Sequence, residues 1–195
     1  MCLKGSYASL AEEGDGPDMT NLSVTEEAYP TDMSNVTFSN NIVYTSCAGA
    51  KFGMQAKAAM SDSLFQDIYV VHARRAVVVE ATEGSQPMRN LRFERVYVDV
   101  IEPTLTRTPA PIQIDTKCNI VRNITVKQLF FAQPLSAIGG SSSIKGKSTK
   151  YNIEGVHFVD VRFGQRPPIK SAAEGRINIE EYATDITFSP WEKPV

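Results

Sequence analysis

A phenylalanine that recurs at one position of a repeated nine-residue pattern constrains the fold more than any other feature of the chain. Six windows share the pattern, and their starts lie 27 to 33 residues apart. The windows begin at Asn35, Asp62, Asn90, Asn123, Gly155 and Asp185, and their fourth positions are Phe38, Phe65, Phe93, Val126, Phe158 and Phe188. Internal repeats of this length are typical of solenoids and other repeat architectures.

The windows have the composition and the spacing of β-strands. Apolar and polar residues alternate within each window, and β-branched and aromatic side chains predominate. A second apolar strand is expected after each of the first five windows, at residues 51–55, 76–80, 111–115, 135–139 and 176–180. Short strands without a clear amphipathic helix between them predict an all-β parallel β-helix, a solenoid of about six coils.

Stacking of these coils gives each repeated position a structural meaning. Strands of neighbouring coils lie about 4.8 Å apart, so the fourth position becomes a column of buried rings. The Asn or Asp at the first position suits a turn, because its side chain tolerates left-handed dihedrals. A β-sandwich is the alternative, but it does not require the same residue type every ~30 positions.

The whole chain, residues 1–195, is predicted to form a single β-helix domain with two extruded loops. Residues 11–34 lack the full pattern and are rich in acids and turn formers, and residues 139–150 read GGSSSIKGKSTK. Clusters of glycine, serine and charged residues between periodic segments are typical of loops.

Composition excludes several classes of function. The 22 acidic residues outnumber the 20 Lys and Arg, which are scattered, so a nucleic-acid partner is not expected. No apolar run approaches the ~18 residues of a membrane span, and the first 16 residues do not form a signal peptide. We expect no cofactor. The three cysteines and two histidines have no metal-ligand spacing, so we expect no metal site and interpret the cysteines as small buried residues.

Alignment of the second strands places acidic side chains in one column. Gln55, Glu80, Asp115 and Glu180 follow the apolar triplet in their coils, and Glu80 and Asp115 belong to neighbouring coils. Two carboxyl groups about 5 Å apart suit the nucleophile and the general acid of a retaining glycosidase, and their proximity raises one pKa. These two residues are the catalytic candidates. The alternative is that strand ends facing water are simply polar.

His72 follows its window at a position where most other coils have polar residues. We interpret it as a hydrogen-bonded histidine at the corner of the coil, with a substrate contact as the alternative. Arg74 and Arg75 then lie in the turn, where one of them is expected to project outward and pair with an acid of a neighbouring coil.

The chain resembles a known family. The Asn-Val-Thr-Phe and Asn-Ile-Thr-Val windows, residues 43–55 (VYTSCAGAKFGMQ) and residues 67–80 (DIYVVHARRAVVVE) are similar to the right-handed parallel β-helix glycosidases of the pectin-lyase-like superfamily. The polygalacturonase-like enzymes of glycoside hydrolase family 28 are the first match and the dextranase-like enzymes the second. The resemblance covers most of the chain from Asn35 onward.

The resemblance implies a polysaccharide-acting hydrolase, extracellular or periplasmic, whose groove would be lined by Lys4, Lys51, Gln55, His72 and Glu80. The aspartate pair of family 28 would precede Met1, and the Gly-His-Gly and Arg-x-Lys motifs are missing from this sequence. The chain is therefore either the C-terminal part of a longer β-helix, inactive alone, or a complete and divergent helix with different chemistry.

A non-catalytic module remains the second functional hypothesis. A β-helix can serve as a carbohydrate-binding, adhesin-like or tailspike-like structural unit, without hydrolysis. An uncapped strand at residues 1–4 also predicts self-association through the open N-terminal coil.

Overall fold

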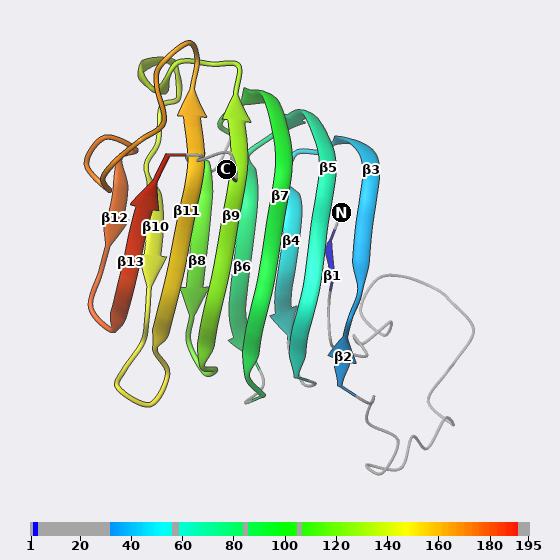
Figure 1. Cartoon of the computed structure of the whole chain (residues 1–195), viewed down its shortest axis with the longest axis vertical. Helices are drawn as coiled ribbons and strands as arrows, with labels where there is room; N and C mark the ends of the chain where they lie inside the picture. Colours follow the sequence, from blue (N-terminus) through cyan, green and yellow to red (C-terminus); the bar gives the residue numbers. More distant parts are fainter. Residues whose placement is uncertain (1, 4–31, 56–58, 84–85, 105–106, 191–195) are drawn as a thin grey trace, which may run out of the picture.

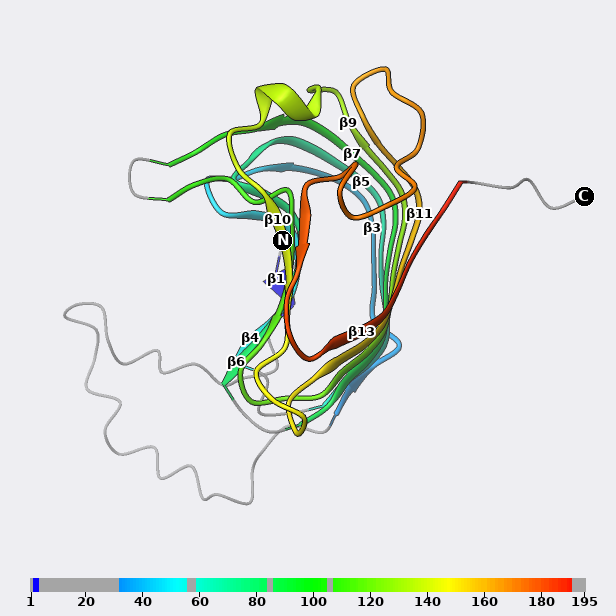
Figure 2. The ribbon, with the colours of Figure 1, turned by 90° about the vertical axis from the view of Figure 1, so that its left-hand side faces the viewer.

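The computed structural model describes residues 2–3, 32–55, 59–83, 86–104 and 107–190. The described chain is an all-β parallel solenoid of about 5 turns, which confirms the predicted fold class. Figure 1 shows the strands standing side by side along the axis of the solenoid, and Figure 2 shows the two walls of strands that enclose the core. No α-helix occurs in the described ranges.

Two sheets form the walls, and all their strand pairs are parallel. The first sheet has the order β1 (Cys2–Leu3), β4 (Ala48–Gln55), β6 (Arg75–Glu83), β8 (Ile112–Thr116), β10 (Ser142–Lys145) and β12 (Ile177–Ile179). The second sheet contains β2 (Met33–Ser34) and β3 (Thr37–Tyr44), which both pair with β5 (Met60–Ala73), then β7 (Met88–Ile101), β9 (Val121–Phe131), β11 (Ile153–Phe163) and β13 (Ala183–Ser189).

Six windows make only about 5 turns. Each of the first five windows forms a strand of the second sheet and is followed by a strand of the first sheet. The sixth window forms β13, and within the described residues no first-sheet strand follows it. The structure therefore has about 5 turns where about six coils were expected, because no first-sheet strand among the described residues completes the coil that β13 begins.

The predicted column of rings is confirmed. Phe38 pairs in register with Phe65, and Phe65 with Phe93, with ring centroids 5.0 Å and 5.7 Å apart. Val126 takes the place of one ring, and Phe158 and Phe188 continue the column at 5.0 Å. The inner members of this column are fully buried, so the repeated position stabilises the solenoid through contact between successive coils.

The expected left-handed turn at the first position of each window is also confirmed. Its residues have positive φ in every window, namely Asn35, Asp62, Asn90, Asn123, Gly155 and Asp185. A second column with positive φ lies five residues further on and was missed, at Asn40, Asp67, Arg95, Gln128 and Asp160. The register of the second sheet skips both columns, so each long strand bends twice and turns around the core.

Two predictions around residue 140 were wrong. Residues 135–139 do not form a strand, because Leu135–Ala137 is a 3₁₀ helix that follows Pro134. The strand of this coil is β10, Ser142–Lys145, which lies inside the stretch predicted to be an extruded loop. Ser142 and Ile144 point inward, and a serine in an inward position hid the apolar alternation. Of the other predicted loop, residues 11–34, the structure describes only residues 32–34.

Candidate functional site

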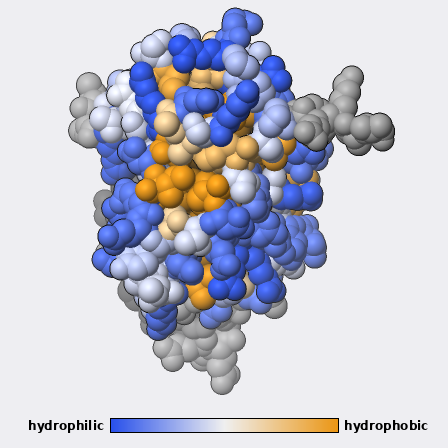
Figure 3. Space-filling model, turned by 60° about the vertical axis from the view of Figure 1, so that its left-hand side comes forward, coloured by the Kyte–Doolittle hydropathy of each residue, from blue (hydrophilic) through white to orange (hydrophobic). Residues whose placement is uncertain are grey.

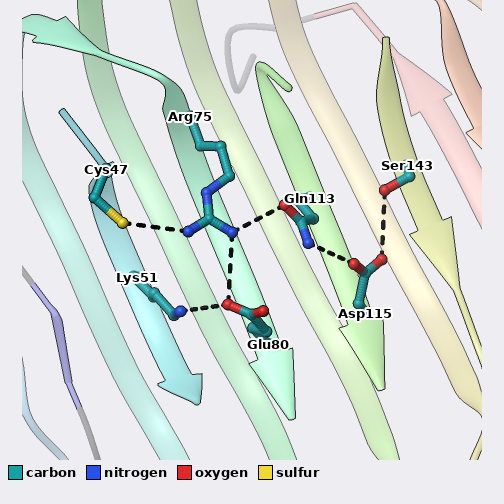
Figure 4. Close-up of polar contacts among 7 residues, drawn as sticks. All are labelled: Cys47, Lys51, Arg75, Glu80, Gln113, Asp115 and Ser143. Carbon is teal, nitrogen blue, oxygen red and sulfur yellow. Dashed lines mark hydrogen bonds and ion pairs between the residues drawn. The ribbon is translucent and has the colours of Figure 1, made fainter. Parts of the chain in front are cut away.

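Side chains of the first sheet alternate between the apolar core and an outer face that is mostly polar, on which Val78 is an apolar exception. Phe52, Val79 and Ile114 pair in register and belong to the hydrophobic core. The next residues along β6 and β8, Glu80 and Asp115, pair with each other on the opposite face. The predicted stacking of the two carboxylates on neighbouring coils is therefore confirmed (Figure 4).

Glu80 is held by two cations. The Lys51 ammonium donates to Glu80 Oε2, and Arg75 Nη1 lies 3.5 Å from the same oxygen. Lys51 and Arg75 are only 4% and 5% exposed. Burial alone would raise the pKa of Glu80, but the hydrogen bond from Lys51 and the charges of Lys51 and Arg75 outweigh it, so the pKa lies below its usual value. Glu80 is consequently ionised at neutral pH.

Asp115 has the opposite electrostatic environment. Gln113 Nε2 donates to Asp115 Oδ2 over 2.5 Å, and Ser143 Oγ donates to Oδ1 over 3.4 Å. Burial raises the pKa of Asp115, and the negative charge of Glu80 raises it further, against the lowering effect of the two hydrogen bonds. Asp115 therefore keeps its proton to a higher pH than an ordinary aspartate, whereas Glu80 loses its proton at a lower pH than an ordinary glutamate.

Arg75 connects this pair to a thiol. Its Nη1 donates to Gln113 Oε1 over 2.9 Å, and its Nη2 donates to Cys47 Sγ over 3.3 Å. Burial would raise the pKa of Cys47, but the hydrogen bond and the charge of Arg75 lower it overall, with help from Lys51 and Arg74. The prediction of buried cysteines was wrong for Cys47, which is exposed and lies beside guanidinium groups.

We call the seven residues drawn in Figure 4 the outer polar cluster: Cys47, Lys51, Arg75, Glu80, Gln113, Asp115 and Ser143. Lys51, Glu80 and Asp115 were predicted as site residues, whereas Cys47, Arg75, Gln113 and Ser143 were not. Gln113 and Ser143 share the register position of Lys51 on their own strands, so the alternation that places Lys51 on this face contained the missing signal.

Arg75 was expected in a solvated turn, with one of Arg74 and Arg75 projecting outward. Both arginines are in fact buried, and Arg75 begins β6. Its acid partner is Glu80 of the same strand, and not an acid of a neighbouring coil. Polar groups of the outer cluster accept hydrogen bonds from Nη1 and Nη2 of Arg75, which offsets part of the cost of burial, whereas its Nε is buried without a hydrogen-bond partner among the described residues.

The polar column continues beyond Asp115 toward the C-terminal end. Lys145 is the register partner of Asp115, and Lys145 Nζ lies 2.5 Å from Glu180 Oε2. A cavity of about 580 Å³ is lined there by Lys145, Ile179, Glu180 and Tyr182, among others. An open space of this kind beside the carboxylate column offers room for a polar ligand.

Gln55 does not belong to this column, contrary to the prediction. Gly53 is the register partner of Glu80, and Gln55 pairs with Glu83 after a register shift behind Met54. Gly53 has a φ of 86°, and a Cβ atom at this position would lie 2.0 Å from the carbonyl oxygen of Glu80. β4 pairs with β6 two residues away from the register that alignment of residues 51–55 with residues 76–80 assumed, because Lys51 pairs with Val78 and not with Ala76. The close approach of the two backbones at Gly53 leaves no room for a side chain.

The other predicted substrate-binding residues lie apart from one another. Lys51 is in the outer polar cluster, whereas His72 lies at the end of β5 in the second sheet. His72 Nδ1 is 3.1 Å from the carbonyl oxygen of Thr45, its Nε2 is 3.2 Å from Glu102 Oε2, and its ring stacks on Tyr44. A hydrogen-bonded histidine near the corner is therefore confirmed. Lys4 lies outside the described residues.

Among the residues that the structure describes, no three His, Cys, Asp or Glu side chains are grouped so as to hold a metal ion. No helix in the same part of the chain has the length and apolarity needed to cross a membrane. No protein-family model, curated protein or solved structure matches the chain. The class that fold and site define is therefore a parallel β-solenoid with a polar cluster on one outer face.

Proposed function

We propose that this solenoid hydrolyses O-glycosidic bonds of a polysaccharide or oligosaccharide, with Asp115 as general acid and Glu80 as the ionised carboxylate. The observation that carries the proposal is that these two residues pair in register while their pKa values shift in opposite directions. Titratable neighbours whose environments separate their pKa values are the usual arrangement of an acid and a base in a hydrolase.

In this reaction Asp115 gives its proton to the oxygen of the leaving sugar as the bond to the anomeric carbon breaks. Glu80 either attacks the anomeric carbon or removes a proton from the attacking water, which distinguishes a retaining from an inverting outcome. Lys51 and Arg75 keep Glu80 negatively charged for either role. Water supplies the new hydroxyl group. In the retaining case Asp115 takes a proton back from that water, and in the inverting case Glu80 takes the proton of the water and both carboxyl groups then exchange protons with solvent.

The resemblance to polygalacturonase-like β-helices supports a polysaccharide substrate and an extracellular or periplasmic setting. The same resemblance supports a longer protein whose main aspartates precede Met1, with dextranase-like enzymes as the second family. The proposal thus has two versions. In one, Glu80 and Asp115 perform the chemistry in this chain, and in the other, aspartates that precede Met1 perform it.

Reducing-sugar release from a panel of soluble polysaccharides tests the proposal. We expect activity in the purified chain, and a loss of 10²-fold or more in Glu80→Gln and in Asp115→Asn, as for general acid catalysis. The matched control is Glu154→Gln, because Glu154 is an exposed acid of the second sheet that pairs with Arg122. Activity that survives both cluster substitutions, or no activity on any substrate, would contradict a catalytic role of this pair.

A column of aromatic side chains favours a second candidate, a non-catalytic carbohydrate-binding module. Tyr69, Tyr97 and Phe130 follow one another on the outer face of the second sheet, with Tyr69 and Tyr97 38% and 48% exposed. Their ring centroids are 6.0 Å and 6.2 Å apart. If this column binds sugar, Tyr97→Ala lowers affinity in calorimetric titration with oligosaccharides, while Tyr44→Ala at the exposed end of β3 leaves it unchanged.

A further inference from the structure

The repeated apolar positions continue into both end coils of the described solenoid. Phe65, Phe93 and Phe158 are at most 1% exposed, whereas Phe38 and Phe188, at the two ends of the same column, are only partly buried. The same contrast holds for the two neighbouring apolar columns, which end at Met33 and Ala183 and at Val36 and Ile186. Among the described residues, the positions that are fully buried in the inner coils are thus only partly buried in both end coils.

The ends also carry strands with one free side. Within the described residues, β13 pairs only with β11, and β2 and β3 pair only with β5. Figure 3 shows an apolar area with a polar surround on the side of the molecule that carries β12 and β13. An edge strand next to apolar surface is a template for pairing with another chain.

The two ends match each other in register. If one copy is shifted along the solenoid axis onto the next, six pairs of equivalent positions meet: Ala183 with Met33, Thr184 with Ser34, Ile186 with Val36, Thr187 with Thr37, Phe188 with Phe38, and Ser189 with Ser39. Each apolar residue meets an apolar residue and each neutral polar residue meets another. No like charges oppose each other in these six pairs.

The turn residues of the two ends are complementary as well. Within the chain, Asn90 Nδ2 donates to Asp62 Oδ1 of the preceding coil over 2.7 Å, at the first position of the windows. In the shifted arrangement Asp185 of one copy precedes Asn35 of the next, so the same donor and acceptor meet in the same order. A junction between copies would therefore repeat contacts that the solenoid already uses between its own coils.

We propose that this chain binds a second copy of itself head to tail, with β13 of one copy pairing in parallel with β2 and β3 of the next. The interface is heterologous and related by translation, so it does not close and each added copy presents a new free end. A two-fold arrangement of identical ends would pair the strands antiparallel and would lose the match between the columns. This inference is independent of the proposed hydrolysis.

Analytical ultracentrifugation over a range of concentrations tests the proposal. The wild-type chain should form a concentration-dependent series of species at multiples of its 21.5 kDa mass. Phe188→Asp blocks one end and Phe38→Asp the other, so each variant alone should be monomeric. A mixture of the two variants retains one free end of each kind and should form a dimer that grows no further.

Two outcomes would overturn the proposal. One is a wild-type chain that stays monomeric at all concentrations, and the other is a discrete dimer that forms from a single end-blocked variant, as two-fold pairing predicts. Circular dichroism of each variant checks that the fold is retained.

A second pair of variants leaves the Phe column intact. Thr184 and Ser34 are exposed, and they share their register position with Arg122 and Glu154, which form an ion pair between neighbouring coils at 3.3 Å. Thr184→Arg combined with Ser34→Arg places like charges across the junction and should weaken association up to about 5-fold. Thr184→Arg combined with Ser34→Glu places opposite charges there and should restore it, and equal association of the two variants would contradict the proposed register.

Discussion

Truncation of a ring in the middle of the Phe column should destabilise the protein much more than truncation at its end. Phe93 is fully buried, and its ring contacts those of Phe65 and Phe52 at centroid distances of 5.7 Å and 5.0 Å. Phe93→Ala removes these contacts and leaves a cavity, so we expect a loss of about 3–5 kcal/mol of unfolding free energy. Phe38 stacks on Phe65 alone and is partly exposed, so Phe38→Ala should cost about 1–2.5 kcal/mol.

Equilibrium unfolding in urea, with circular dichroism as the readout, measures both variants against the wild type. The two substitutions delete the same atoms from the same repeated position. Any difference in the loss of unfolding free energy therefore comes from the surroundings of the ring and not from the side chain itself. Because solenoid coils contact only their neighbours, the inner coil should contribute through two interfaces and the end coil through one. Equal losses in the two variants, or a larger loss for Phe38→Ala, would refute the reasoning.

Three further predictions concern single positions. Gln128 has a φ of 56°, so Gln128→Gly should raise the free energy of unfolding by about 0.5–1 kcal/mol and Gln128→Val should lower it by about 1 kcal/mol, measured in urea. Arg75 lowers the pKa of Cys47, so iodoacetamide should alkylate Cys47 faster at pH 7 in the wild type than in Arg75→Gln. Peptide mass spectrometry measures the two alkylation rates, and equal rates would exclude an effect of Arg75 on the thiol. The raised pKa of Asp115 means that the folded protein binds this proton more tightly than the unfolded chain, so the wild type loses stability as the pH rises above the ordinary Asp range. Asp115→Asn should therefore be more stable than the wild type at pH 7, with the difference vanishing near pH 3, and a variant that is less stable at pH 7 would contradict this assignment.

The fold could be predicted because single residue types recur at fixed positions of its repeat. A ring at the fourth position and an Asn or Asp at the first position are local choices, and stacking places each of them in register with its copies. The second left-handed column escaped prediction because Arg95 and Gln128 are not residues that usually adopt positive φ. A position defined by backbone geometry, and not by residue type, leaves little trace in a sequence.

The site could be predicted only in part, for a similar reason. Glu80 and Asp115 were found because each follows an apolar triplet at the same position of its predicted strand, and the two residues pair in register in the structure. Gln55 was misplaced because alignment of the predicted strand ends paired it with Glu80, whereas Gly53, two residues earlier, is the register partner of Glu80. Cys47 was missed because its chemistry depends on Arg75, which is 28 residues away in the sequence and becomes a neighbour only after the coils stack.

The central claim is that the stacking of two coils gives neighbouring carboxyl groups opposite roles. The most direct test is an NMR titration of the side-chain carboxyl carbons in the ¹³C-labelled protein, assigned with Glu80→Gln and Asp115→Asn. Glu80 should titrate below, and Asp115 above, the ordinary range of its residue type. Two carboxyl groups that both titrate at their ordinary values, or the reverse order, would contradict it.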